Sequence, residues 1–363
     1  MMNRRTFLLA TGALALPDCG PNHATLLRDV WRPPEVRSTA LRSVLDELVR
    51  LATLAANSHN SQPWHFRCRE GSVEIRPDFA RRLPVVDADD HHLWVSLGCA
   101  AANIVEAAPA FGLSGEARMR EGPDGSHVQV ALAPAPDTGE RSLEAIVGRQ
   151  CARSTYDGRP LEATAARILA GTGRESGVDV DLLVTPEHRS ALSELIIRGN
   201  ATQVADTRFR KELESWLRFN ASHAAQTRDG LFTGCLGAPT APAFLARMFF
   251  DGSFTVEREN ERLRAQLDST PAFAVVTGPE ATPAGWVAVG LAVQRLALAA
   301  TRLDVAHAHV NQPVEVAALR GQLAKLVGHE DRRPDLVLRL GHGPPMPRSL
   351  RRPTEDVIER SGG

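Results

Sequence analysis

The chain has 363 residues, of which 43% are hydrophobic and 23% are charged, and this composition is typical of a folded globular protein. It excludes collagen-like, disordered and polytopic membrane proteins. Lys and Arg number 42 against 43 Asp and Glu, so the net charge of -1 gives no general attraction to nucleic acid or anionic lipid. At roughly 150 residues per domain, the length favours two domains over one.

The N-terminus has the pattern of an export signal. Arg4 and Arg5, followed by Phe7-Leu8-Leu9, precede an apolar run from Ala10 to Leu16, which is far shorter than the ~20 residues that cross a bilayer. Paired arginines before Phe-Leu resemble a twin-arginine signal, so we expect residues 1–24 to lie outside the fold. This predicts a periplasmic or envelope protein without an integral membrane span. A frayed basic N-terminus on a cytoplasmic protein is the alternative.

The remaining patterns predict helices and strands in an irregular order. Periodic leucines predict an amphipathic helix over Arg37–Ala55. Two hairpins are expected, one turning at Glu70-Gly71 and one within Gly122–Gly125. Because strands and helices do not alternate strictly, the predicted fold class is α+β. The further predicted strands are 178–184, 272–276, 305–310 and 335–340, with helices over 191–197 and 314–326.

An internal repeat is visible in the sequence. Trp94–Ala100 aligns with Trp286–Ala292 through shared Trp, Val, Gly and Ala, at an offset of 286 − 94 = 192 residues. This predicts two related halves fused as a pseudo-dimer. Two unrelated alanine-rich helices are the alternative. The expected halves are 37–140 and 141–357, and the second contains an insertion at about 210–264.

Two polar segments occur only once each. In the first, Asn57–Phe66, Pro63 blocks helix continuation and several amide and ring groups lie close together, as in a binding site or in an Asx-type turn with a buried Trp. The second contains Arg149 and Arg153, which four-residue spacing would place on one face of a helical turn. Such a pair can bind phosphate, although a solvated face is the commoner outcome. A third basic group, Arg348 with Arg351–Pro353, lies near the C-terminus.

These residues together resemble the FMN-binding nitroreductase superfamily, and among its members the fused, Acg-like proteins. The resemblance rests on Asn60–Phe66, the Arg-x-x-x-Arg unit, the helix from Trp286 and the closing Arg-Arg-Pro, and it covers about Arg37 to Val357. It implies a nitroreductase-like fold and FMN bound between the halves. Because each segment is present once, one FMN site per chain is expected.

The resemblance also implies which residues contact FMN. Phosphate and ribityl contacts fall to Arg149, Gln150, Cys151 and Arg153, with Arg351 and Arg352 as further phosphate partners. The isoalloxazine would be covered by Ser58, His59 and Asn60, with Gln62 in the same segment, and Asn311 and Gln312 would lie near flavin N5. Cys151 departs from the family pattern, because a Ser or Thr commonly stands there and a thiol is a weaker donor.

Metal and hydrolase sites are less well supported. Asp87–His92 includes potential metal ligands but lies directly before a helix, where an acidic N-terminal cap is the simpler interpretation. His307 and His309 alternate on a predicted strand without a third ligand nearby. No metal is therefore expected, and hydrolase and P-loop motifs are absent from the sequence.

The implied activity is that of a flavin oxidoreductase. Hydride would pass through flavin N5 to a nitroaromatic or quinone-like acceptor, so no side chain needs to be the catalyst. The partners would be a small-molecule electron donor and acceptor, and a further homodimer is left open. The alternative is an exported protein that sequesters FMN with little turnover, because the insertion resembles a lid. A flavin-free scaffold ranks third.

Overall fold

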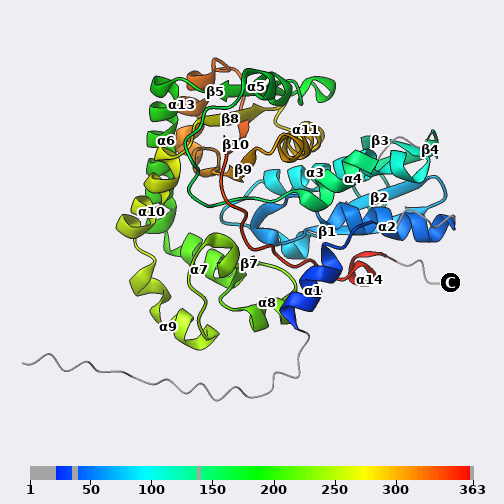
Figure 1. The fold of residues 1–363 in the computed structure, drawn as a ribbon, viewed down its shortest axis with the longest axis horizontal. Coiled ribbons are helices and arrows are strands. Elements are labelled where there is room, and N and C mark those ends of the chain that lie inside the picture. The colour runs from blue at the N-terminus through cyan, green and yellow to red at the C-terminus, as the bar shows by residue number, and fades with distance from the viewer. Residues whose placement is uncertain (1–21, 35–39, 137–139, 360–363) are drawn as a thin grey trace, which may run out of the picture.

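The computed structural model describes residues 22–34, 40–136 and 140–359. Residues 1–21 of the expected export signal lie outside these ranges. Residues 22–24 are described, and His23 and Ala24 belong to helix α1 with Asn22 as its N-cap, so the expectation that they lie outside the fold is wrong. Within them the chain forms two four-stranded antiparallel sheets and a largely helical insertion (Figure 1), so the α+β prediction is confirmed.

The two sheets have the same topology. The first runs in the order β1-β2-β4-β3 and the second in the order β5-β8-β10-β9. In each, one long helix connects the second strand to the third in chain order, and every strand pairing is antiparallel. The predicted fusion of two related halves is thereby confirmed. The bounds are β1 Trp64–Arg69, β2 Ser72–Pro77, β3 Leu113–Arg120, β4 His127–Pro134, β5 Asp179–Leu183, β8 Ala272–Thr277, β9 Ala306–His309 and β10 Pro334–Gly341.

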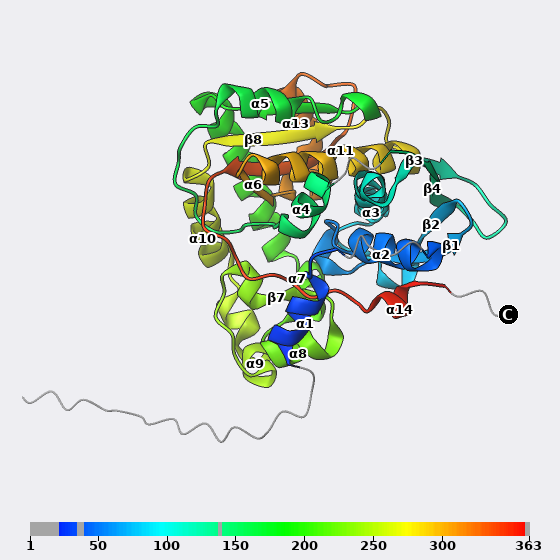
Figure 2. The same cartoon turned by 45° about the vertical axis from the view of Figure 1, so that its right-hand side comes forward.

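The two connecting helices form the centre of the molecule. Helix α3 (His91–Ala107) packs on the first sheet, α11 (Pro283–Arg302) packs on the second, and the helices pack on each other (Figure 2). They cross where a Cβ on Gly98 would lie 2.3 Å from the Val287 carbonyl oxygen, and one on Gly290 2.2 Å from that of Val95. These four residues are equivalent in the repeat, so the contact is reciprocal, as at a two-fold axis.

A single apolar core crosses this helix pair and joins the two sheets. Both helices are long and apolar enough to cross a membrane, but 83% of the best window in His91–Phe111 and 72% of that in Pro283–Arg302 are buried inside the protein. They are accounted for as core helices. Gln294 and Asn103 add a buried hydrogen bond of 2.7 Å between them.

The second sheet is interrupted by a long insertion. β1 and β2 are joined by a tight turn, whereas the equivalent strands β5 and β8 are separated by the segment 184–271. This segment is wider than the expected 210–264. Its elements are α6 Pro186–Ala205, α7 Thr207–Trp216, β6 Leu217–Arg218, α8 Ala221–Thr227, β7 Leu231–Phe232, η5 Thr233–Leu236, α9 Ala243–Ser253 and α10 Val256–Asp268.

The sequence patterns located most remaining elements. Both hairpins are present, and the helix predicted over Arg37–Ala55 is observed as α2 (Leu41–Thr53). The helix predicted over 314–326 is broken at Val316 into α12 (Gln312–Glu315) and α13 (Ala317–Val327). The other elements are α1 His23–Val30, η1 Ser58–Asn60, η2 Phe79–Arg81, η3 Ala108–Phe111, α4 Glu140–Gly148, α5 Ala163–Ala170, η4 Arg174–Ser176 and α14 Thr354–Val357.

The reciprocal glycine contact predicts a sharp effect on stability. Gly98→Ala forces a methyl group against a backbone carbonyl that cannot move without shifting α11, so we expect a loss of about 1–3 kcal/mol or more. Gly321→Ala, on the exposed face of α13 with nothing within 4 Å of the added methyl, should instead gain up to ~1 kcal/mol. Thermal unfolding of both variants measures this, and equal melting temperatures would contradict the packing role of Gly98.

Candidate functional site

A cavity of about 750 Å³ lies between the halves and the insertion. This size is within the usual range for small-molecule and cofactor sites. The first half contributes the loop before β1 and the first half of α3, and the second contributes β9, α12 and β10. The insertion closes the remaining side with α6, α7, α9 and α10.

Five of the twelve predicted site residues line this cavity. They come from three separate parts of the sequence and are Ser58, His59, Arg153, Asn311 and Gln312. Arg153 is notable because its guanidinium makes no hydrogen bond or ion pair within the described residues. Gln312 Oε1 is likewise buried without a partner there. Unpartnered polar groups on a cavity wall indicate a site for a polar ligand.

The loop before β1 has an unusual backbone. His59, Asn60 and Gln62 have positive φ angles of 51°, 52° and 52°, a conformation that is uncommon for residues other than glycine. Asn57 stabilises the loop, because its Oδ1 accepts a 2.9 Å hydrogen bond from the Gln62 backbone N–H. Tertiary contacts must provide the rest, since such backbone strain persists only where the surroundings enforce it.

Those tertiary contacts come from the insertion and from the C-terminal tail. The Asn60 amide donates to the carbonyl oxygens of Gly230 at 3.0 Å and Leu350 at 3.2 Å. The Gln62 amide donates to the Arg228 carbonyl at 3.0 Å, and its Oε1 accepts from the Arg352 backbone N–H at 2.8 Å. Asn60 and Gln62 therefore face away from the cavity and hold the loop.

The two C-terminal arginines belong to the same tail. The Arg351 guanidinium is buried and donates to Thr53 O at 2.7 Å and to Asn60 Oδ1 at 2.9 Å. Burial and the nearby Arg149 lower the pKa of Arg351 to about 9. Arg352 contacts Asp78 and the Gln62 carbonyl. Neither side chain lines the cavity, and both hold the tail against the first half.

The segment after α4 departs from expectation. Helix α4 ends at Gly148, so Arg149 and Arg153 do not share a helical face, and that prediction is wrong. The chain instead runs extended beside β9. The backbones of Cys151 and His307 form an isolated parallel β-bridge there, and the Ala152 N–H donates to the His307 carbonyl at 2.8 Å. This pairing with a strand outweighs the four-residue spacing.

As a result, the side chains of residues 149–153 do not all point to the same place. Arg149 is buried and donates to the Leu54 carbonyl at 2.8 Å, while its Nε has no partner within the described residues. Gln150 exchanges two hydrogen bonds with the Met346 backbone. Of this segment, Arg153 alone lines the cavity.

The polar part of the cavity is electropositive. Burial lowers the pKa of His59 to about 4 and that of His309 to about 3, and the positive charge of Arg153 acts in the same direction. Both imidazoles are therefore neutral at pH 7. The residues of permanent charge type that line the cavity are three arginines, Arg153, Arg262 and Arg339, and two glutamates, Glu259 and Glu315.

Three cavity residues were missed by the sequence patterns. Arg339 on β10 is fully buried, stacks 4.2 Å from the Tyr156 ring centroid and leaves Nη1 without a partner in the described chain. His92 has no hydrogen bond on either ring nitrogen there, and its Nδ1 lies 4.0 Å from Glu315 Oε1. Burial raises the pKa of Glu315. The sequence offered one signal for these residues: Arg339 is a charged residue between Leu338 and Leu340 in a strand that is otherwise apolar there.

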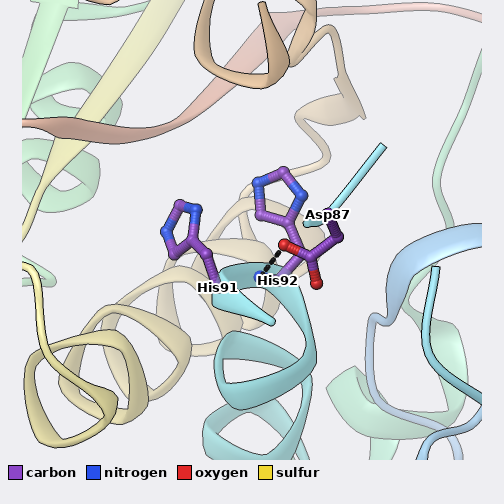
Figure 3. Close-up of side chains that lie close together, drawn as sticks. All are labelled: Asp87, His91 and His92. Atoms are coloured by element: carbon purple, nitrogen blue, oxygen red, sulfur yellow. Dashed lines mark hydrogen bonds between the residues drawn. The ribbon is translucent and has the colours of Figure 1, made fainter. Parts of the chain in front are cut away.

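The cluster Asp87, His91 and His92 has ligand atoms within 4.8 Å of one another (Figure 3). Both Asp87 oxygens already accept backbone N–H groups, from His92 and Leu93 at 2.9 Å each. The interpretation as an N-terminal cap of α3 is thereby confirmed. The Nε2 of His91 lies 2.8 Å from Asp335 Oδ1, and its Nδ1 faces Arg333 at 3.0 Å. Asp87 and His91 are therefore held by protein groups, whereas His92 has no hydrogen bond on either ring nitrogen among the described residues.

The insertion makes the opposite wall of the cavity apolar. Aromatic and leucine side chains from α7, β6, β7, η5 and α9 and from the loops beside them line it there. They are Phe209, Leu213, Leu217, Phe219, Leu231, Leu236, Leu245, Phe249, Phe250 and Phe254. One cavity thus combines a cationic, hydrogen-bonding side with an apolar side.

No protein-family model matches the chain. Two proteins of Mycobacterium tuberculosis (strain ATCC 25618 / H37Rv) that are provisionally named NAD(P)H nitroreductases match it along most of its length. Rv3131 is 25% identical over 323 residues, covering 86% of this chain and 90% of that protein. Acg is 23% identical over 324 residues, and the match covers 87% of this chain and 95% of that protein. The predicted resemblance to Acg-like nitroreductases is confirmed.

Solved structures of nitroreductases also match the chain. The FMN-dependent nitroreductase NfnB from Mycobacterium smegmatis, in complex with NADPH, is 14% identical with a TM-score of 0.41 and covers 61% of this chain and 99% of its own. A Bacteroides fragilis nitroreductase with bound FMN is 16% identical with a TM-score of 0.35, and the match covers 56% of this chain and 89% of that one.

The lowered histidine pKa values predict acid sensitivity. The folded state binds fewer protons than the unfolded state between about pH 4 and 6.5, so stability is complete above pH 6.5 and falls on acidification. His309→Gln removes one such group, so its melting temperature should fall less between pH 7 and pH 5 than that of the wild type. His188→Gln, exposed on α6, is the control and should follow the wild type. Parallel curves for all three proteins would contradict the burial of a neutral His309.

Proposed function

We propose that the cavity binds FMN and that the protein is an FMN-dependent oxidoreductase. The observation that carries this is that two guanidinium groups line one cavity: within the described residues Arg153 makes no side-chain hydrogen bond, and Arg339 leaves Nη1 without a partner. A phosphate is the ligand that such groups bind best. The relatives' nitroreductase names agree with this ligand and suggest a nicotinamide dinucleotide as electron donor.

The cavity residues fit the rest of the cofactor as well. His309 Nδ1 and Gln312 Oε1 are buried without partners in the described chain, so a bound ring system with polar edges would satisfy them. Ser58 and His59 from the first half face the same space as Asn311 from the second. FMN would therefore be held between the halves, at one site per chain.

When bound, FMN supplies two-electron hydride chemistry, while the protein supplies orientation and electrostatics. Arg153 and Arg339 hold the phosphate, and the neutral His59 and His309 avoid adding charge beside the ring. The apolar wall excludes water and binds an apolar electron acceptor. We propose a quinone-like or nitroaromatic compound as this acceptor. Arg149, Arg351 and Arg352 would not contact FMN; they hold the loop before β1 and the C-terminal tail in place.

Substituting two arginines tests these assignments. Arg153→Ala should lower the FMN content of the purified protein at least tenfold without lowering the melting temperature of the flavin-free form, because its guanidinium makes no hydrogen bond or ion pair within the described residues. Arg351→Ala should lower that melting temperature, since it removes the donor to the Thr53 carbonyl oxygen and to Asn60 Oδ1. Released flavin is quantified by its absorbance, with one FMN per chain expected in the wild type.

Unchanged FMN occupancy in Arg153→Ala would remove this residue from the site. Protein that stays colourless after incubation with FMN would overturn the cofactor proposal itself.

A second candidate function is FMN storage with little turnover. It is favoured by the insertion, whose helices α7, α9 and α10 form the cavity wall opposite the arginines and so limit entry. An export route would add to this case, because nicotinamide donors are scarce outside the cytoplasm. We propose export through the twin-arginine-like segment on the sequence pattern alone.

A change confined to α9 separates the two functions. Removing residues 215–260 would also delete Asp229, which pairs with Arg218 and Arg81, and the Gly230 carbonyl that holds Asn60. Replacing 243–253 by a glycine-serine linker leaves these contacts in place. With NADPH and a soluble quinone, turnover that rises at least tenfold in this variant supports storage, whereas equal turnover supports the oxidoreductase. Retained FMN is the control for folding.

A further inference from the structure

Helix α9 exposes an apolar face. Four large hydrophobic side chains are solvent-exposed on this one helix: Phe244 at 68%, Leu245 at 37%, Met248 at 68% and Phe249 at 64%. The other exposed large hydrophobic residues among those described are scattered singly, as at Ile168 and Val184. A cluster of this kind marks an interaction site, whereas isolated residues need no explanation.

The opposite face of α9 is already used. Ala246 and Phe250 face the cavity, and Phe250 stacks on Phe254 with ring centroids 4.9 Å apart. Leu245 and Phe249 also line the cavity although they are partly exposed, whereas Phe244 and Met248 do not line it. The helix is thus apolar on both sides, one packed inward and the other without a partner in the described protein.

The position of α9 indicates what covers it. Helix α8 connects it to α1: the Asn220 amide before α8 donates to the Ala241 carbonyl at 3.1 Å, and His23 of α1 lies against Phe232 with ring centroids 5.0 Å apart. Helices α1, α8 and α9 lie at one end of the molecule in both views (Figures 1 and 2). The 21 residues that precede Asn22, with their apolar run Ala10–Leu16, therefore join the chain at this same end.

An exposed arginine accompanies the apolar side chains of α9. Arg247 lies between them in sequence, and on α1 Arg28 is exposed beside the exposed Asp29. Arg4 and Arg5 precede the apolar run in sequence. Exposed aromatic and aliphatic side chains with arginines among them are the composition of helices that lie in a membrane interface.

We propose that α9 docks the protein on an anionic lipid bilayer by inserting Phe244 and Met248, with Phe249 beside them. The N-terminal apolar run, where it is retained, would enter the same bilayer and hold this end of the molecule against it. Because α9 also forms a cavity wall, docking places that wall next to compounds dissolved in lipid. The proposal does not depend on which function the cavity has.

The test is sedimentation of the full-length protein with vesicles of phosphatidylcholine and phosphatidylglycerol. The wild type should bind, and Phe244→Ser/Met248→Ser should lower the partition coefficient by about tenfold or more, because two inserted side chains are lost. Ile168→Ser/Val184→Ser, which removes two comparably exposed side chains elsewhere, is the matched control and should bind like the wild type. In a second measurement, Phe244→Trp should be quenched by brominated lipid.

Each contrary outcome overturns the proposal. Equal binding by the α9 variant would assign membrane contact to the N-terminus alone. Vesicle binding that is absent in the full chain and gained on removal of residues 2–21 would mean that the N-terminal segment covers α9. A dimer that Phe244→Ser/Met248→Ser converts to a monomer, without vesicle binding, would assign the face to a second copy.

Discussion

The structure depends on the close approach of α3 and α11 at Gly98 and Gly290. With no Cβ at either position, each backbone contacts a carbonyl of the other helix, and the apolar faces behind them merge into one core. This contact fixes how the two sheets stand relative to each other. It thereby fixes the distance between His59, which belongs to the first half, and His309, which belongs to the second, across the cavity that both halves line.

The same architecture divides work among the polar residues around the cavity. Within the described chain, those that face it, such as Arg153 and Arg339, keep donors without a partner, whereas Asn60, Gln62 and Arg351 use theirs on backbone carbonyls. The second group holds a strained loop in place from two directions, the insertion and the tail. A site whose loop is held this firmly needs little rearrangement to accept a ligand, which lowers the entropic cost of binding.

Much of the fold was predictable because its signals are local. Hairpin turns, strand alternation and the Trp-Val-Gly-Ala repeat each occupy a few neighbouring residues, and they located both sheets and the central helix pair. The site was predictable only in part. The pairing of Cys151 with β9 moved Arg149 away from Arg153, and the partners of Arg351 lie almost 300 residues earlier in the chain. Arg339 stood in an ordinary buried strand, and its role depends on which elements pack around it.

The insertion between β5 and β8 has a consequence for how such a protein can evolve. In a homodimer of identical subunits, every added segment appears twice, so a wall over one cavity would also be built over its symmetry mate. Joining the two copies in a single chain removes that coupling. One half can then acquire about 80 residues of new structure while its counterpart keeps a two-residue turn at Glu70-Gly71. The fused chain thereby gains the freedom to specialise each side separately, a freedom that symmetry denies to its unfused counterparts.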